Sequence, residues 1–401
     1  MSELSYLEKL LDGVEVEWLP LGEVSALRRG RVMSKGYLTE NFGPYPVYSS
    51  QTANNGKIGS INTFDFDGEY ISWTTDGANA GTVFYRTGKF SITNVCGLIT
   101  LKSKYPLIYK FLFYWLTIEA KKHVYSGMGN PKLMSHQVEN IPVPIPCPDN
   151  PEKSLAIQSE IVRILDKFSA LTAELTAELT AELNMRKKQY NYYRDKLLNF
   201  KDIAGGGNYI LPDAMDGIRI EWKTLGEVAV IGTGNHDTQD AIEHGKYIFY
   251  ARGREPLKLN VFDFDETAII TAGDGAGVGK VFHYAKGKYA LHQRAYRIVP
   301  NAFMNPRFVY HYITAYFFTY IQKASVSSSV TSLRRPMFLK FPIPVPPSEE
   351  QARIVEILDK FDTLTNSITE GLPREIELRQ KQYEYYRDLL FSFPKPETVS
   401  N

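Results

Sequence analysis

Ile161-Val-Arg-Ile-Leu-Asp-Lys-Phe168 returns almost unchanged as Ile354-Val-Glu-Ile-Leu-Asp-Lys-Phe361. After an equal interval, each copy is followed by a second shared block that begins at Arg186 or Arg379 and reads Gln-Tyr-x-Tyr-Tyr-Arg-Asp after its basic start. A third pair opens the two halves: Asp12-Gly-Val-Glu-Val-Glu-Trp-Leu-Pro-Leu-Gly-Glu-Val24 and Asp216-Gly-Ile-Arg-Ile-Glu-Trp-Lys-Thr-Leu-Gly-Glu-Val228. The period is near half of the 401 residues, too long for a solenoid. We therefore predict a duplicated module, which suits a target that itself has two parts.

Each half is predicted to hold a mixed domain followed by a long helix. Short strand-like runs separated by Gly, Asn and Asp turn signals come first. A Pro-rich stretch at 141–146, matched at 341–347, is then expected to be extended, because Pro lacks a donor and disfavours helix in its predecessor. The predicted ranges are 1–150 and 204–347 for the domains, and 151–203 and 348–401 for the helices.

The first long helix contains three tandem copies of Thr-Ala-Glu-Leu at 172–183. Matched apolar stripes and equal spacing in the two helices predict that they pack as an antiparallel pair. Gly371 and Pro373 predict a break or kink near the middle of the second helix. The stripes consist of Leu171, Leu175, Leu179, Leu183, Leu364, Ile368, Leu372 and Ile376.

Composition bounds the class of protein. A hydrophobic content of 43% indicates folded cores, and no apolar run is long enough for a membrane span. The N-terminal residues lack a signal-peptide pattern, and Cys96 and Cys147 have no metal-ligand spacing, so we expect a cytoplasmic protein. The net charge of +1 excludes a chain-wide basic field but not local basic patches.

The motifs of enzymes are missing. The Gly-rich stretch 273–280 has Asp274 where a phosphate-binding loop needs its first Gly, and Val281 where it needs Ser or Thr, so we expect a tight turn between strands. Asn130-Pro131-Lys132 lacks the second Pro and the aromatic residue of the adenine methyltransferase motif. The seven His and two Cys give no zinc pattern and no nucleophile–base pair. We therefore predict a protein without catalytic or metal residues.

Several loop-like stretches combine Arg or Lys with amide and hydroxyl side chains. Arg reads guanine, Asn and Gln read adenine, and Ser or Lys holds phosphate. Polar loops without any ligand are the alternative. The candidate DNA-binding residues are Arg28, Arg29, Arg31, Lys35, Ser50, Gln51, Asn54, Asn55, Lys57, Asn130, Lys132 and His136 in the first half, and Asn235, His236, Thr238, Arg252, Arg254, Ser328, Thr331, Arg334 and Arg335 in the second.

The two halves differ in these loops, whereas their flanks and helices match. Residues 49–52 align roughly with 251–254, and 127–132 with 327–332, and neither pair is similar in sequence. A common scaffold with different reading loops would recognise two different short sequences.

This arrangement resembles the specificity subunit of type I restriction-modification systems over essentially the whole chain, and the tandem repeat resembles the type IC branch. The resemblance implies an α+β fold. Two similar mixed α/β target-recognition domains stand in tandem, separated by two long antiparallel conserved helices with internal pseudo-two-fold symmetry. It also implies that each domain reads one half of a split, asymmetric site in double-stranded DNA, and that the chain itself holds no cofactor.

The resemblance further implies partners: two methylation subunits that use S-adenosylmethionine, and restriction subunits that use ATP and Mg²⁺. A repeated basic face on the helices suits two copies of one partner, although a solvated charged face is the alternative. A stand-alone two-domain DNA-binding regulator and a scaffold that does not bind DNA also remain open. The candidate subunit-interface residues are Arg186, Lys187, Lys188, Arg194, Arg379, Lys381 and Arg387.

Overall fold

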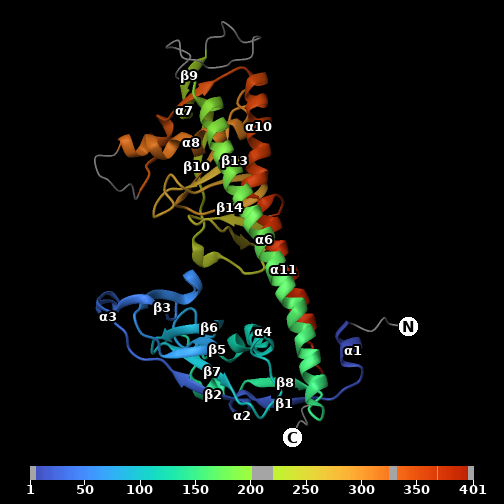
Figure 1. Ribbon diagram of the computed structural model, residues 1–401. Helices are drawn as coiled ribbons and strands as arrows, with labels where there is room; N and C mark the ends of the chain where they lie inside the picture. Colours follow the sequence, from blue (N-terminus) through green and yellow to red (C-terminus); the bar gives the residue numbers. More distant parts are fainter. Residues whose placement is uncertain (1–5, 128, 201–219, 325–331, 368, 396–401) are drawn as a thin grey trace. The chain divides into compact units, whose positions relative to one another are not determined.

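The computed structural model describes residues 6–127, 129–200, 220–324, 332–367 and 369–395 (Figure 1). The chain divides into two compact units, one formed by Met1–Ala177 with Glu377–Asn401 and the other by Glu178–Ile376. Each unit thus combines one strand-rich domain with a segment of each long helical region. In the described part of the chain, no helix has the length and apolar character needed to cross a membrane.

The two strand-rich domains share one sheet topology. The strand order is β2-β7-β5-β6-β3-β4 in the first and β10-β15-β13-β14-β11-β12 in the second. Only β3–β6 and β11–β14 pair in parallel among these described strands. The duplication is therefore structural as well as sequential. The strands are β2 (Ser25–Arg29), β3 (Phe42–Tyr48), β4 (Lys57–Ile61), β5 (Phe66–Thr74), β6 (Val83–Ile92), β7 (Cys96–Leu101), β10 (Ala229–Thr233), β11 (Tyr247–Tyr250), β12 (Leu257–Leu259), β13 (Phe264–Ala272), β14 (Phe282–Leu291) and β15 (Ala295–Pro300).

The Pro-rich stretches are strands, which confirms the predicted extended conformation. β8 (Pro142–Pro146) pairs with β1 (Val16–Pro20), and β16 (Pro342–Val345) pairs with β9 (Glu221–Thr224), both antiparallel. Because Pro occupies alternate positions, the missing N–H groups all lie on one edge of the strand, and the residues between them can still donate. This two-stranded ribbon therefore joins the beginning of each strand-rich domain to its end, and the second strand leads into the long helix.

Helices cover one face of each six-stranded sheet. α4 (Tyr109–Glu119) contacts β5 and β6, and α8 (Pro306–Ala324) contacts β13 and β15. Their aromatic residues pack into the main cores with the central strands, so burial of apolar surface drives the docking. The short elements are α1 (Tyr6–Leu11), α2 (Leu21–Val24), α3 (Lys35–Glu40), η1 (Ala53–Gly56), η2 (Ala120–His123), α5 (Ser135–Val138), α7 (Leu225–Val228), η5 (Thr238–Asp240) and α9 (Arg335–Leu339).

The first long helix is continuous, whereas the second is broken. α6 (Pro151–Leu198) has 48 residues, and its counterpart consists of α10 (Ser348–Asn366) and α11 (Leu372–Leu390). Gly371 has φ +81°, and a Cβ there would lie 2.5 Å from the carbonyl oxygen of Thr363. Only Gly fits this left-handed, crowded position, so the predicted break is confirmed. Pro373 falls in the first turn of α11, where its missing N–H is tolerated.

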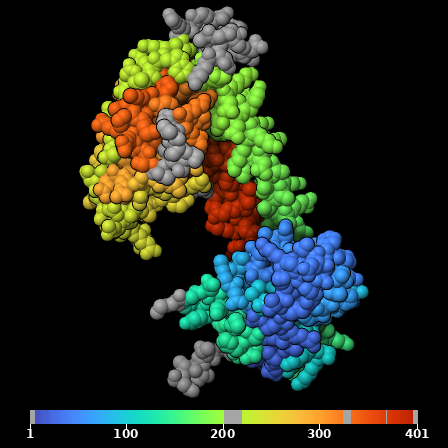
Figure 2. All heavy atoms as spheres, turned by 90° about the vertical axis from the view of Figure 1, so that its left-hand side faces the viewer, coloured from blue at the N-terminus to red at the C-terminus, as the bar shows by residue number. Residues whose placement is uncertain are grey.

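Reciprocal aromatic contacts join the helices in each unit. In the first unit Phe168 stacks on Tyr386, with ring centroids 5.3 Å apart, and Ser169 donates a hydrogen bond to the Tyr383 hydroxyl. In the second unit Phe361 stacks on Tyr193 at 5.4 Å. The Ile-Leu-Asp-Lys-Phe block of each helix therefore meets the tyrosine block of the other. This confirms the antiparallel packing, which Figures 1 and 2 show as green α6 beside red α10 and α11.

Most residues of the apolar stripes are partly buried. Leu372 is buried, while Leu175, Leu179, Leu183, Leu364 and Ile376 are partly exposed. Leu171 differs from the expectation, because 52% of its surface is exposed. A spacing of four residues drifts around a helix that has 3.6 residues per turn, so no one side of α6 keeps every Leu against its partner. Ile368 lies outside the described residues.

A carboxylate in the shared helix block anchors each domain. Asp166 accepts hydrogen bonds from Lys110 and Tyr114 of α4, at 2.6 and 2.7 Å. At the matching position Asp359 accepts from Arg307 and His311 of α8, at 2.6 and 2.7 Å. The acceptor is the same, and the donors sit four residues apart on the facing helix in both domains. The two halves of the chain therefore share the position of this contact and its aspartate, whereas the donor residues differ.

Candidate DNA interface

An Asp-Gly turn after the central strand organises the candidate loops of each domain. Asp76 follows β5 and forms an isolated bridge with Lys132, and Asp274 follows β13 and forms the same bridge with Ser332. Lys132 and Ser332 are the last residues of the two stretches that the sequence aligned, 127–132 and 327–332. One candidate loop in each half thus ends at this turn.

In the first domain Arg29 reaches the turn from the end of β2. Its Nη2 donates to the hydroxyl of Thr75 at 3.2 Å and to the carbonyl of Asn94 at 2.7 Å. The Thr75 hydroxyl donates in turn to Asp76 at 2.6 Å. Arg29 remains exposed, so this chain of hydrogen bonds orients a guanidinium that solvent can reach.

A second pair of side chains occupies matching positions in the two domains, with an aspartate in both and a different basic residue in each. Arg31 binds the carboxylate of Asp65 at 3.0 Å, and His236 lies 3.1 Å from the carboxylate of Asp263. Both aspartates occupy the second position of the shared Phe-Asp-Phe-Asp stretch. The predicted residues Arg31 and His236 are therefore equivalent, and each already has a carboxylate partner within its domain.

The buried side chain of Arg86, which is only 3% exposed, supports the loop between β3 and β4. Arg86 donates to the carbonyl of Asn55 at 2.8 Å and lies over the ring of Tyr48 at 3.6 Å. Burial lowers the pKa of Arg86 to about 10, which leaves it charged at neutral pH. Asn54 and Asn55 both adopt left-handed backbone conformations, φ 49° and 55°, and present their amides to solvent.

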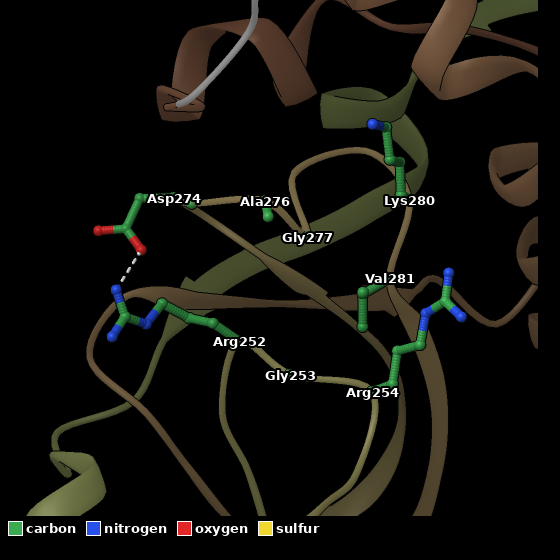
Figure 3. A pocket seen from close by; sticks show the side chains of 9 residues that line it. Arg252, Gly253, Arg254, Asp274, Ala276, Gly277, Lys280 and Val281 are labelled. Carbon is green, nitrogen blue, oxygen red and sulfur yellow. Dashed lines mark hydrogen bonds and ion pairs between the residues drawn. The ribbon is translucent and has the colours of Figure 1, made fainter. Parts of the chain in front are cut away.

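In the second domain a pocket of about 560 Å³ opens between the loop 252–254 and the Gly-rich turn 274–281 (Figure 3). Arg252, Arg254 and Lys280 line it together with Asp274. Arg252 points to Asp274 and donates to one carboxylate oxygen at 2.8 Å, while Arg254 and Lys280 lie apart from that carboxylate. Arg294 donates to the other oxygen at 3.2 Å. One carboxylate thus holds two guanidinium groups.

A buried histidine lies beside these arginines. His292 is 1% exposed, and its Nδ1 accepts the backbone N–H of Arg294 at 2.8 Å, so the proton of the neutral ring is on Nε2. Nε2 has no hydrogen-bond partner among the described residues, and Asp237 is 3.7 Å away. Burial, reinforced by the charge of Arg252, lowers the pKa of His292 and keeps the ring neutral.

The other predicted DNA-binding residues are more scattered. Gln51 donates to the carbonyl of Lys57 within the β3–β4 loop, and the Ser50 carbonyl accepts from Asn79 beside the Asp-Gly turn. No described residue group could hold a metal ion. Ser328 and Thr331 lie outside the described residues. The remaining predicted residues are exposed and lie on separate short elements or loops: Arg28, Lys35, Asn130, His136, Asn235, Thr238, Arg334 and Arg335.

Sequence reasoning missed several members of this interface. Lys280 ends the Gly-rich stretch, which is a turn between β13 and β14, as predicted, yet its side chain lines the pocket. In the sequence, Asp274 departs from a phosphate-loop motif and Asp274-Gly275 matches Asp76-Gly77, but nothing there indicates that it binds arginine. Arg86 and Arg294 gave no signal, because their partners are distant in sequence, and no motif in the sequence marked His292.

Some surface contacts recur at matching positions of the long helices. Arg194 binds Asp195 and Arg387 binds Asp388, at 2.7 and 2.8 Å. The candidate residues Arg186 and Lys381 bind Glu182 and Glu377, Arg379 donates to Gln382, and Lys187 and Lys188 are exposed. Two large side chains not singled out from the sequence, Tyr192 and Tyr385, are 60% and 64% exposed at matching positions. The doubled Tyr-x-Tyr-Tyr signal could have revealed them.

Comparison with known proteins assigns the family. The model of the type I restriction modification DNA specificity domain matches residues 13–185 and 219–378. The chain is 40% identical to the specificity subunit of the type I restriction enzyme EcoR124I/EcoR124II of Escherichia coli, over all of both chains. It is 39% identical to the EcoprrI specificity subunit of the same species, over 92% of this chain and 93% of the relative.

Solved structures share the fold. The crystal structure of the type I restriction-modification S subunit from M. genitalium superposes with a TM-score of 0.55 at 17% identity, covering 96% of this chain and 98% of that one. A chain from a structural study of complex assembly and conformational transition of the type I R-M system gives 0.55 at 15% identity, covering 94% and 97%. The family match, the full-length relatives and the shared fold establish that this chain belongs to the type I restriction-modification specificity subunits, the DNA-recognition components that are not themselves catalytic.

Proposed function

We propose that the chain recognises a bipartite, asymmetric DNA site, with one half-site read by each domain. The observation that supports this most is the pair of identical sheet topologies whose Asp-Gly turns hold different cationic side chains. A common scaffold with different reading residues suits two different base sequences. The long helices then set the distance between the half-sites.

The charge of the chain favours recognition within a complex over a stand-alone regulator. Phosphate contacts dominate the affinity of DNA-binding proteins, and a net charge of +1 supplies few of them beyond local patches. Methylation and restriction subunits would add contacts and chemistry, with S-adenosylmethionine, ATP and Mg²⁺ held in those partners. Such a complex acts on DNA in the cytoplasm.

The repeated helix surface is proposed as the docking face for two methylation subunits. Each copy offers an exposed tyrosine, Tyr192 or Tyr385, beside an arginine–aspartate pair. Equal surfaces suit two copies of one partner. Reversing the charge at matched positions, Lys188→Glu with Lys381→Glu, is expected to weaken assembly in size-exclusion chromatography, whereas Lys153→Glu on the same helix serves as the exposed control. Unchanged assembly of the double variant would discard this face.

The proposed function is tested by mapping modified adenines. The chain is co-expressed with its methylation subunit in a host that lacks both, and the genome is sequenced with and without the chain. The expected result is a split motif with a fixed gap that depends on the chain. A modification pattern that does not change when the chain is omitted would contradict the proposal.

The tandem repeat predicts how the gap responds to deletion. One Thr-Ala-Glu-Leu unit adds about 6 Å of helix and rotates it by about 40°, while one base pair adds about 3.4 Å and 34–36°. The rotations nearly agree, and the rises agree only if the helix runs obliquely to the DNA. With that geometry, deleting residues 176–179 is expected to shorten the unspecified gap by about one base pair and to leave both half-sites unchanged. If either half-site changed instead, the helix would not be the ruler.

A further inference from the structure

The carboxylate of the Asp-Gly turn occupies one position in both domains but holds different arginines. Asp274 directly binds Arg252, from the loop after β11, and Arg294, from the turn between β14 and β15. Asp76 acts through the Thr75 hydroxyl on Arg29, which comes from β2. The acceptor is thus part of the shared scaffold, whereas the arginines come from different elements.

An arginine fixed by a carboxylate is well suited to read a base. Arg presents five N–H donors, and the bond to Asp274 engages one of those of Arg252, so a two-pronged edge remains for the O6 and N7 acceptors of guanine. Holding the side chain in place before binding reduces the entropy lost on contact. Partial burial opposes ionisation of Asp274, but hydrogen bonds from Arg252 and Arg294 outweigh it and lower the pKa of this carboxyl, so the anchor stays charged at neutral pH.

The pocket separates two kinds of cation. Arg252, which lines the pocket, shares the carboxylate of Asp274 with Arg294, and that carboxylate offsets one of their two positive charges. Their attraction for a phosphate is therefore weakened, whereas their remaining N–H donors still fit the acceptors of a guanine edge. Arg254 and Lys280 line the same pocket without a carboxylate partner among the described residues, which suits a phosphate group. Base reading and backbone holding are therefore assigned to different side chains.

We propose that Asp76 and Asp274 are the positioning residues of the two reading surfaces, and that they orient Arg29 in the first domain and Arg252 with Arg294 in the second to read guanine. The inference rests on the proposed function and names the residues that carry its specificity. It requires at least one G·C pair in each half-site.

The test uses the assembled methyltransferase with Asp274→Asn and maps modified adenines as for the unaltered chain. Loss of the charged anchor is expected to relax discrimination at one or more G·C positions of a single half-site by about 5- to 150-fold, the range for a bidentate arginine contact. The other half-site and the gap should not change. Asp76→Asn should relax only the opposite half-site. Asp265→Asn and Asp67→Asn, exposed aspartates at matching positions of the same domains, are the controls.

A second set of variants separates reading from folding. Arg252→Lys retains the charge but loses the fork, and it should relax the same positions as Asp274→Asn. Arg254→Gln should lower modification at all sites without altering base preference. The proposal would be overturned if Asp274→Asn and Arg252→Lys both assembled and both kept the base preference of the unaltered chain. Half-sites without G·C pairs would also overturn it. Failure of the proposed function would differ, since the unaltered chain would then give no dependent motif.

Discussion

The two units differ at the candidate interfaces of their strand-rich domains and agree in the aromatic contacts between their helices. Around the Asp-Gly turn, Arg29 in one domain is replaced by Arg252 and Arg294 in the other. At the helices, Phe168 on Tyr386 is matched by Phe361 on Tyr193 with nearly the same geometry. Shared contacts thus mark the scaffold, and divergent ones mark the surfaces that carry different specificities.

The cores show a subtler difference at one cross-strand pair. Trp73 faces Gly97 in the first domain, and Thr271 faces Tyr296 at the same register in the second. The large side chain has changed strand, and its polar end still reaches the same place: the Trp73 indole donates to the carbonyl of Leu133, and the Tyr296 hydroxyl to the carbonyl of Leu333. Both domains therefore fill this part of the core with one large side chain, but the side chain comes from a different strand in each.

The strongest way to break this comparison is to remove the large side chain. Trp73→Thr should destabilise the first domain by about 3–5 kcal/mol, the cost of truncating a buried aromatic residue. Adding Gly97→Tyr recreates the pair of the second domain and should recover about 1–3 kcal/mol through their coupling. Amide hydrogen exchange of each domain during denaturant titration measures both values. A double variant no more stable than Trp73→Thr would show that the two cores are not interchangeable.

The anchoring carboxylates allow a pH test. Asp359 is partly buried, which opposes ionisation, but hydrogen bonds from His311 and Arg307 prevail and lower its pKa. Its contribution to stability is therefore present above the ordinary pKa of 3.8 and is lost as the pH falls through the lowered value. Asp359→Asn should cost about 2–3 kcal/mol at pH 7, less than for a fully buried ion pair, and should flatten the acid limb of the unfolding curve. An unchanged acid limb would contradict this assignment.

The broken helix offers a smaller contrast. Gly371→Ala should destabilise the second unit by about 1–2 kcal/mol, because the new Cβ meets a carbonyl in a left-handed conformation. Glu178, at the matching position of continuous α6, should tolerate Ala within about 0.5 kcal/mol. Thermal unfolding of the two variants compares them directly. Equal effects would mean that the break is not imposed by Gly371.

The smallest expected effect tests whether the two aromatic stacks between the helices contribute equally to stability. Double-mutant cycles with Ala at Phe168 and Tyr386, and at Phe361 and Tyr193, should each give a coupling of about 0.5–1.5 kcal/mol. Denaturant unfolding followed by hydrogen exchange supplies the values. A coupling present in one unit and absent in the other would show that only one stack contributes.

The sequence predicted the features that depend on a local residue type or on the repeat. Pro at alternate positions leads to the edge strands, Gly371 leads to the break, and equal block spacing leads to the antiparallel stacks. The alignment of 49–52 with 251–254 also agrees with the strand register, since Tyr48 and Tyr250 pair with Ile92 and Leu291 of the matching strands. The bonds of Asp274 to Arg252 and Arg294 were not predictable, because the strand order brings together loops about 20 residues apart.

The most direct test of one scaffold with two specificities is to give the chain the same domain twice. Residues 220–346 are replaced by 16–146, with both junctions in the two-stranded ribbons, and modified adenines are mapped for the assembled complex. The account predicts a motif with the half-site of the first domain on both sides of the gap and none of the second. A motif that still contained the second half-site would contradict the claim that each domain reads its own.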